Sequence, residues 1–288
     1  MSTTQTNSAT TAFATQRSLV PWGKFSLRFT AFLYLAVMVA LPLATIIQSG
    51  LADGFRVFWS DVTNVTAFSA LKLTVTSSAI VTLINAGMGT LTAYVLVRYR
   101  FPGKGLFNAL IDLPFAIPTL VTGVMLVALY GPQRTVGAWL TAHGVRVIFA
   151  TPGIVLALLV ITYPFVIRAV QPVLMELERG QEEAAYTLGA SKWTTFRKVV
   201  LPSITPALVT GCLLSFARSL GEFGSIVVVA GNIPGVTLTA PVYVFGQIES
   251  QNQRGASAMS ILLLALSFTL IVSVEWLQGR NRSRNAQR

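Results

Sequence analysis

The sequence predicts an all-α integral membrane protein with six transmembrane helices. Three observations support this fold class: the composition, the length of the apolar segments and the distribution of basic residues between them. Hydrophobic residues make up 53% of the 288-residue chain and charged residues only 11%, whereas soluble domains carry about 25% charged residues. We therefore expect a lipid bilayer, rather than water, to surround most of the protein.

Six apolar segments are long enough to cross a bilayer, because a helix needs roughly 20 apolar residues to span the hydrocarbon core. A polar tail precedes them, and it is predicted to be disordered because it has few side chains to bury. The first segment is too long for a signal peptide and lacks a small-residue cleavage site, so we interpret it as a span. The tail covers residues 1–24, and the spans cover 27–48, 70–97, 106–130, 152–170, 203–230 and 256–277 of a membrane domain at 25–278.

Basic residues between the spans predict the orientation. Of the 21 Lys and Arg residues, fifteen lie in segments that face the cytoplasm if the N-terminus is inside, and four lie in the outer loops. This excess predicts that both termini are cytoplasmic, including the basic C-terminal tail at 279–288. The net charge of +11 therefore reflects orientation. It does not indicate nucleic-acid binding, because the basic residues do not cluster with aromatic residues on a polar surface.

The third span contains features of a gated path. Pro114 and Pro118 are expected to break or kink the helix, which membrane proteins tolerate where helices line a cavity. Thr119 and Thr122 follow the prolines and supply hydroxyl groups. Asp112, near the inner end, would repel an anion, so we interpret it as structural, with an Arg of the second loop as its partner.

The longest cytoplasmic segment, residues 171–202, carries the most specific pattern in the chain. The pattern consists of Glu183-Ala184-Ala185, Gly189, Val199, Leu201 and Pro202. Its first part predicts a short helix with an apolar stripe, flanked by Glu182 and Glu183 and made of Leu177, Ala184, Ala185 and Leu188. The small alanine side chains allow another protein surface to approach closely.

Two residues predict how this segment turns. Gly189 can adopt the left-handed conformation that ends a helix, and Ser191 is then placed to cap a second short helix. Pro202 marks the entry to the fifth span. A helix-turn-helix with a small apolar face is suited to the groove of a partner protein. The alternative is a folded loop in which Glu-Ala-Ala is a chance tripeptide.

The pattern resembles the EAA loop of ATP-binding cassette (ABC) importer permeases, in which the same residue types recur at the same spacing. The resemblance implies the type I importer permease fold and a loop that docks onto an ATP-hydrolysing subunit. The residues implied in docking are Glu183, Ala184, Ala185, Gly189, Leu201 and Pro202. The chain has no Gly-x-x-x-x-Gly-Lys-Ser/Thr sequence, so ATP and Mg²⁺ are expected on a separate polypeptide. We predict no catalytic residue, metal site or cofactor in this chain.

Arg218 and Glu222 in the fifth span form a second informative pattern. Four residues apart on one helix, they share a face and can pair. A charge at mid-membrane costs about 2.5–3.5 kcal/mol on insertion scales, so it usually faces an aqueous path or a partner. Two hypotheses follow: Arg218 lines an anion route with Glu222 fixing it, or an intramembrane salt bridge holds the fifth span to its neighbour. The candidate pathway residues are Arg218, Ser219, Glu222, Thr119 and Thr122.

Several runs resemble the sulfate, molybdate and tungstate permeases, and most of all the T-type (U-type) sulfate/thiosulfate members. They are Arg98 to Lys104, Asp112 to Thr119, Pro164 to Arg168 and Arg218 to Gly224. The resemblance implies import of sulfate and thiosulfate across a bacterial inner membrane, with molybdate or tungstate as the alternative cargo. It also implies three partners: a homologous W-type permease, a dimeric ATP-binding subunit and an external sulfate/thiosulfate-binding protein.

Other classes of function predict features that this sequence has weakly or lacks. A secondary anion transporter or channel would need relay carboxylates in the spans. Asp112 and Glu222 are candidates, and Glu222 is already matched to Arg218. A membrane-embedded enzyme would need clustered His, Asp or Glu residues or a nucleophile, but the chain has one Cys and one His. A passive assembly subunit would have no need of the docking loop.

Overall fold

The structure, a computed structural model, describes residues 22–285, and all regular elements in that range are helical. The chain divides into two compact units, Met1–Thr45 and Ile46–Arg288. The first unit contains α1 (Trp22–Leu35), a wider π-helical turn (Ala36–Ala40) and the beginning of α2 (Leu41–Leu51). Most of the predicted disordered tail lies outside the described residues, but α1 already begins at Trp22.

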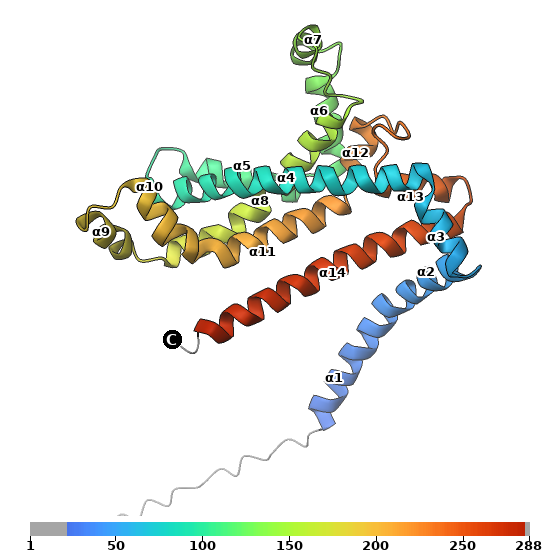
Figure 1. The fold of residues 1–288 in the computed structure, drawn as a ribbon, viewed down its shortest axis with the longest axis horizontal. Coiled ribbons are helices and arrows are strands. Elements are labelled where there is room, and N and C mark those ends of the chain that lie inside the picture. The colour runs from blue at the N-terminus through green and yellow to red at the C-terminus, as the bar shows by residue number, and fades with distance from the viewer. Residues whose placement is uncertain (1–21, 286–288) are drawn as a thin grey trace, which may run out of the picture. The chain divides into compact units, whose positions relative to one another are not determined.

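The second unit contains the remaining helices (Figure 1). In chain order they are α3 (Phe55–Thr63), α4 (Val65–Arg98), α5 (Lys104–Ala116), α6 (Thr119–Tyr130), α7 (Thr135–Ala142), α8 (Thr151–Glu176), α9 (Arg179–Thr187), α10 (Lys192–Thr195), a π-helical turn (Phe196–Val200), α11 (Leu201–Leu220), α12 (Gly224–Val229), α13 (Ala240–Glu249) and α14 (Gln253–Asn285).

Three long helices, α4, α8 and α11, form the centre of this unit and lie side by side in Figure 1. Val166 of α8 is buried between the other two. A Cβ atom added at Gly89 of α4 or at Gly211 of α11 would lie 3.0 or 2.9 Å from Val166 atoms. Small residues thus let both helices approach α8. Such close packing matters in a bilayer, because apolar burial provides no driving force between helices in lipid.

The third predicted span, 106–130, is not one continuous helix. α5 and α6 meet at 112° across Ile117 and Pro118. Proline lacks an N–H and pushes the preceding residue out of the helical conformation, and Ile117 is extended, with φ −86° and ψ 127°. The predicted break therefore occurs. Pro118 causes it, because Pro114 lies inside α5 without ending that helix.

The fifth predicted span, 203–230, also differs from the structure. Helical residues run from Lys192 through the π-helical turn to Leu220, so the helix begins inside the predicted loop. Pro202 does not interrupt it, because it lies in the first turn of α11 after the wider π-helical turn, where its missing N–H is tolerated. The helix ends at Leu220, and α12 begins only at Gly224.

Five helices in the described chain are long and apolar enough to cross a membrane, and the bent pair α5–α6 provides a sixth if it counts as one span. This agrees with the predicted fold class, an all-helical membrane protein with six spans. The backbone of α14 continues as a helix to Asn285, beyond the predicted end of the last span at 277. Residues 286–288 of the predicted basic tail lie outside the described range.

Candidate functional site

The turn between α9 and α10 has the geometry predicted from Gly189. This residue has φ +84°, in the left-handed region that favours glycine. The N–H of Gly189 donates to the carbonyl of Tyr186 at 2.9 Å, and the N–H of Ala190 donates to the carbonyl of Ala185 at 3.0 Å. Together these bonds form a Schellman motif, which satisfies carbonyl groups left free at the end of α9.

The predicted cap of the second helix is also present. Ser191 Oγ accepts a hydrogen bond from the N–H of Thr194 at 3.2 Å, which satisfies a free donor at the start of α10. The helix that begins here is continuous with α11. The turn at Gly189 is therefore attached directly to a central helix and not through a flexible link.

The side chains around α9 do not form the predicted stripe. Leu177 packs against the core cluster near the end of α8, and Glu182 is buried instead of flanking exposed apolar residues. Leu177 precedes α9 in extended backbone, with φ −68° and ψ 113°, so the helical periodicity that the prediction assumed does not reach it. The prediction of a stripe from Leu177 to Leu188 was wrong at its first residue and in the position of Glu182.

The exposed surface of the loop carries the Glu-Ala-Ala part of the pattern. Glu183 and Ala184 are exposed, and Ala185 is half-buried. Two large apolar side chains lie nearby in the chain, Leu188 with 88% and Trp193 with 69% of their surfaces exposed. An exposed surface of this composition, apolar with a carboxylate, has the chemistry of a protein-docking site.

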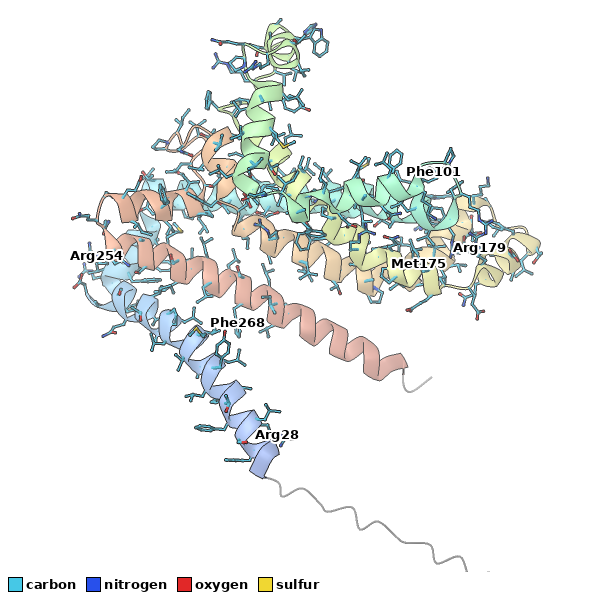
Figure 2. The ribbon with its side chains drawn as sticks, turned by 180° about the vertical axis from the view of Figure 1, so that it is seen from behind. Arg28, Phe101, Met175, Arg179, Arg254 and Phe268 are labelled. Atoms are coloured by element: carbon cyan, nitrogen blue, oxygen red, sulfur yellow. The ribbon has the colours of Figure 1, made fainter. Side chains whose placement is uncertain are left out.

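The Leu-Pro part of the pattern lies elsewhere. Leu201 and Pro202 begin α11, and Leu201 packs against the core cluster. Leu201 therefore anchors the loop to the central helices, whereas Pro202 is exposed. Figure 2 shows Arg179 of α9 at the end of the second unit opposite Arg254. We call these the loop end and the Arg254 end.

An ion pair that sequence analysis missed ties the loop to α4. Arg98 Nη2 lies 2.5 Å from Glu182 Oε1, and the two side chains are 9% and 8% exposed. Arg98 also donates to the carbonyl of Leu177 at 3.2 Å, and the Tyr94 hydroxyl donates to Glu182 Oε2 at 3.4 Å. A pocket of about 210 Å³ opens beside the pair and also borders Glu183. The sequence held only a weak signal, an Arg at the end of a span and a Glu beside the motif.

The two interrupted helices, α6 and α12, pack closely against each other. A Cβ atom at Gly123 would lie 2.8 Å from the carbonyl oxygen of Ser225, so the two backbones touch. Thr119 is half-buried and lies beside Gly224, and Thr122 is buried. Helix breaks at membrane depth are tolerated where protein covers them or where they line a water-filled cavity. The structure thus brings Thr119 to the α12 side of the bundle.

Arg218 and Glu222 form the predicted pair, with Arg218 Nη1 2.8 Å from Glu222 Oε2. They do not share a helix, which corrects the prediction, because α11 ends at Leu220 and Glu222 lies in the break before α12. The other Glu222 oxygen accepts bonds from the N–H and the hydroxyl of Ser225, each at 2.9 Å. Glu222 is 1% exposed and Arg218 34% exposed. The carboxylate is therefore fully engaged, while part of the guanidinium is accessible.

The other candidate pathway residue on α11 is already satisfied within its own helix. Ser219 is buried, and its hydroxyl donates to the carbonyl of Ser215 at 2.8 Å. Sequence analysis could not foresee this, because a serine in a helix can either bond its own backbone or face a path.

Asp112 pairs with Arg168 of α8, not with an Arg of the second loop as predicted. The Arg168 guanidinium reaches both carboxylate oxygens, at 2.7 and 2.6 Å. Arg168 also donates to the side chains of Asn108 and Gln171. Because α5 packs along α8, Arg168 is the basic residue that Asp112 meets. Asp112 thus joins two helices, which is the structural role predicted for it.

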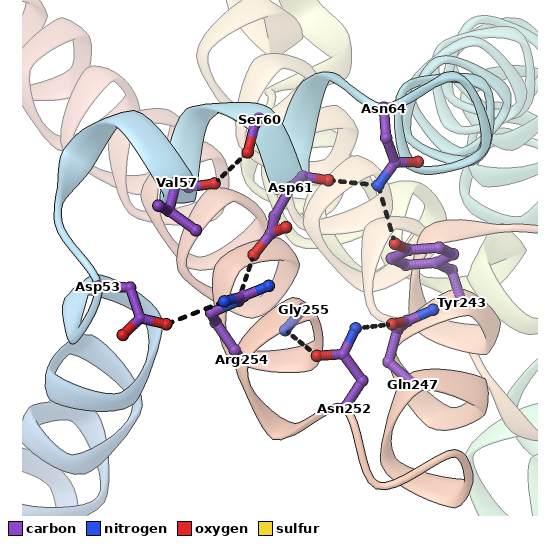
Figure 3. A network of polar contacts seen from close by, with 10 residues as sticks. All are labelled: Asp53, Val57, Ser60, Asp61, Asn64, Tyr243, Gln247, Asn252, Arg254 and Gly255. Carbon is purple, nitrogen blue, oxygen red and sulfur yellow. Dashed lines mark hydrogen bonds and ion pairs between the residues drawn. The ribbon is translucent and has the colours of Figure 1, made fainter.

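A polar network that sequence analysis did not predict lies at the Arg254 end (Figure 3). Arg254 Nε donates to Asp61 at 3.0 Å, and Arg254 Nη1 donates to Asp53 at 2.9 Å. Asn64 caps α4 by accepting a bond from the N–H of Ala67 at 2.8 Å and donates to the carbonyl of Asp61. The network joins α3 and the start of α4 to the start of α14.

Known proteins resemble this chain over most of its length. Residues 85–284 match the family model described as binding-protein-dependent transport system inner membrane component. The chain is 42% identical to the probable sulfate transport system permease protein cysT of Nephroselmis olivacea, over 87% of this chain and 88% of the relative. It is 41% identical to the sulfate transport system permease protein CysT of Escherichia coli (strain K12), over 87% of this chain and 91% of the relative.

A solved structure has the same fold. It is a chain of the bacterial alginate ABC transporter in complex with an alginate pentasaccharide-bound periplasmic protein. The TM-score is 0.75 at 17% sequence identity, and the match covers 90% of this chain and 95% of that chain. At that identity the likeness concerns the fold alone.

Proposed function

Because the chain belongs to the family of binding-protein-dependent transport system inner membrane components, we propose that it is the permease subunit of an ATP-driven sulfate importer. Relatives that are 41–42% identical over most of the chain are named sulfate permeases, which supports sulfate as the cargo. Thiosulfate is the second substrate in this proposal, because the T-type pattern in the sequence implies it. The protein is a multi-pass membrane protein, and the basic residues favour a cytoplasmic location for both termini and the loop.

The observation that carries the proposal is the construction of the loop end. The Schellman turn at Gly189 and the cap at Ser191 give the loop one defined shape. That shape leaves Glu183 and Ala184 exposed, with Leu188 beside them. A rigid exposed helix that continues into a central helix is suited to convert movement of a partner into movement of the bundle.

The partners follow from the same proposal. A dimeric subunit binds ATP and Mg²⁺ and docks onto the loop. A homologous W-type permease completes the translocation path, and an external binding protein delivers the anion. This chain holds no ATPase site of its own. When ATP binding closes the ATPase dimer, the loops of both permeases move together, and the path changes from inward-open to outward-open.

Arg218 is the residue we assign to the anion path. Its guanidinium is the partly exposed member of a pair whose carboxylate is buried and held by Ser225. Glu222 therefore fixes Arg218 and closes the break between α11 and α12, while Arg218 offers hydrogen-bond donors to a passing oxyanion. In this proposal the salt bridge orients the path residue. Thr119, Thr122 and Ser219 support the path by packing.

The experiment that tests the function is transport by the complete complex. We would reconstitute the chain with its partner permease, ATPase and binding protein in vesicles, and follow ATP-dependent uptake of labelled sulfate with thiosulfate and molybdate as competitors. We expect uptake to require ATP and to be inhibited by thiosulfate but not by molybdate. Arg218→Gln should lower uptake while the complex still assembles, whereas Lys72→Gln, which removes a basic residue elsewhere in a span, should not.

Contrary results would separate the alternatives. Flux that persists without ATP or without the ATPase would favour a secondary transporter or channel. Preferential uptake of molybdate would retain the importer and change only the cargo. Undiminished uptake by the Arg218→Gln complex would leave the substrate contacts to the partner permease.

A further inference from the structure

We propose that Arg98 and Glu182 form the joint through which movement of the loop reaches α4, and that both act as positioning residues. The proposal rests on the proposed function, because it presupposes that the loop docks onto an ATP-hydrolysing partner. The loop is joined covalently to two central helices, to α8 through Leu177 and Glu178 and to α11 along α10. The ion pair connects it to the third central helix, at the end of α4. Through this pair, one docking event also moves α4.

Burial sets this pair apart from the other ion pairs in the described part of the chain. Its side chains are 9% and 8% exposed, whereas each of the other pairs has at least one side chain that is 34% or more exposed. A buried charge that loses its partner is strongly unfavourable. Separation of α9 from α4 would leave Arg98 or Glu182 without its charged partner, so the two helices are constrained to move together.

Two adjacent glutamates of α9 lie in different environments and have different roles in this proposal. Successive residues on a helix point about 100° apart, so Glu182 and Glu183 point in different directions. Glu182 is buried against α4, and Glu183 is exposed. Both border the same pocket, so a partner that binds at Glu183 acts within a few side chains of the joint.

Aromatic contacts extend the joint to the second helix of the loop. Tyr94, one turn before Arg98, donates to Glu182 and also meets Phe196 edge-on, with ring centroids 5.8 Å apart and planes at 88°. Phe196 begins the π-helical turn between α10 and α11. The end of α4 therefore contacts both arms of the loop, α9 through charge and the π-helical turn through packing.

The test measures sulfate taken up per ATP hydrolysed, per assembled complex, in vesicles that contain all four components. Glu182→Gln removes the charge and keeps the shape, and Glu183→Gln is the matched change at the neighbouring exposed residue. We expect Glu182→Gln to retain the ATPase subunit but to lower uptake per ATP about fivefold or more, the range of typical coupling between sites. The double variant Arg98→Glu/Glu182→Arg should restore at least half of the ratio.

Glu183→Gln should act differently, by weakening docking, so that ATP hydrolysis and uptake fall together and their ratio is kept. An unchanged ratio for the assembled Glu182→Gln complex would overturn the joint. If Glu182→Gln fails to assemble, the charge-reversed double variant decides: a restored ratio supports the joint, and an assembled but uncoupled complex overturns it. Failure of the proposed function is recognised separately, because the unaltered complex would then show no ATP-dependent uptake.

Discussion

The two ends of the second unit hold their charges in opposite ways. At the loop end, Arg98 and Glu182 are 9% and 8% exposed and 2.5 Å apart. At the Arg254 end, Arg254 is 44% exposed and lies 2.9 Å from Asp53 and 3.0 Å from Asp61. Both arrangements join helices that are distant in the sequence, and the contact distances are similar.

The comparison shows that the distance between two charged groups does not reveal how much their ion pair contributes to stability. Water and salt screen an exposed pair, which therefore contributes little to stability. A buried pair is held because breaking it leaves a charge without solvent. Backbone features, in contrast, should matter at both ends, since strain and capping do not depend on screening. Each of the following predictions tests one part of this contrast.

The largest effect is expected from Glu182→Ala at the loop end. Removal of one partner of a buried pair costs about 3–5 kcal/mol, because Arg98 then stays buried without a counter-charge. Urea unfolding of the purified chain in detergent, followed by tryptophan fluorescence, measures the loss in free energy of unfolding. A loss no larger than that of Arg254→Gln would abolish the contrast between the two ends.

Two glycine replacements test whether backbone strain matters at both ends. Gly189 has φ +84° and Gly54, before α3, has φ +88°, and a Cβ atom added at either meets no atom within 4 Å. Alanine should therefore cost about 1–2 kcal/mol at Gly189 through conformation alone. The cost at Gly54 should be at least as large, because its ψ of 162° places it in a region that only glycine commonly adopts. Gly180→Ala on α9, where φ is not positive, serves as the control and should not destabilise. A cost at Gly54 below that at Gly189 in the same unfolding experiment would contradict this prediction.

Two caps provide a smaller test of backbone features at the two ends. Ser191 accepts a bond from the N–H of Thr194 at the loop end, and Asn64 accepts one from the N–H of Ala67 at the Arg254 end. Replacement of each by alanine is expected to cost about 1 kcal/mol. Thermal unfolding of the two variants side by side should show similar decreases in Tm, and both decreases should persist at high salt.

The smallest effect is expected from Arg254→Gln. Its guanidinium and the Asp53 carboxylate are both exposed, so solvent replaces the lost contacts. The Tm of the purified chain should change little at low salt, and the remaining difference from the unaltered chain should vanish in 1 M NaCl. A large decrease that salt does not remove would show that the network in Figure 3 is a structural anchor after all.

Local features of the candidate site were predictable, and contacts between distant segments were not. The left-handed turn at Gly189 and the cap at Ser191 depend on residues within one or two helical turns, and both were predicted correctly. The break at Pro118 was expected for the same reason. The helical break before Glu222 was missed, because the apolar residues on both sides of it were interpreted as one span, although Gly221 and Gly224 flank the break.

The main errors of the sequence-based predictions concerned which residues the charged side chains contact. Asp112 was assigned to an Arg of the second loop but pairs with Arg168, because the packing of α5 along α8 decides which cation it meets. Glu182 was placed on an exposed flank but is buried against Arg98. Helical periodicity states which residues share a face, but it does not state which neighbour covers that face.

The sequence by itself determined that the chain is a multi-span helical membrane protein with a defined helix-turn-helix between two spans. Both properties are local: a helix satisfies its backbone hydrogen bonds within its own segment, and a turn depends on the conformations that its few residues allow. Only the tertiary structure decided which charges are buried and what they pair with. The physical reason is that burial and pairing depend on the distances between helices, and these are set by the packing of the whole unit.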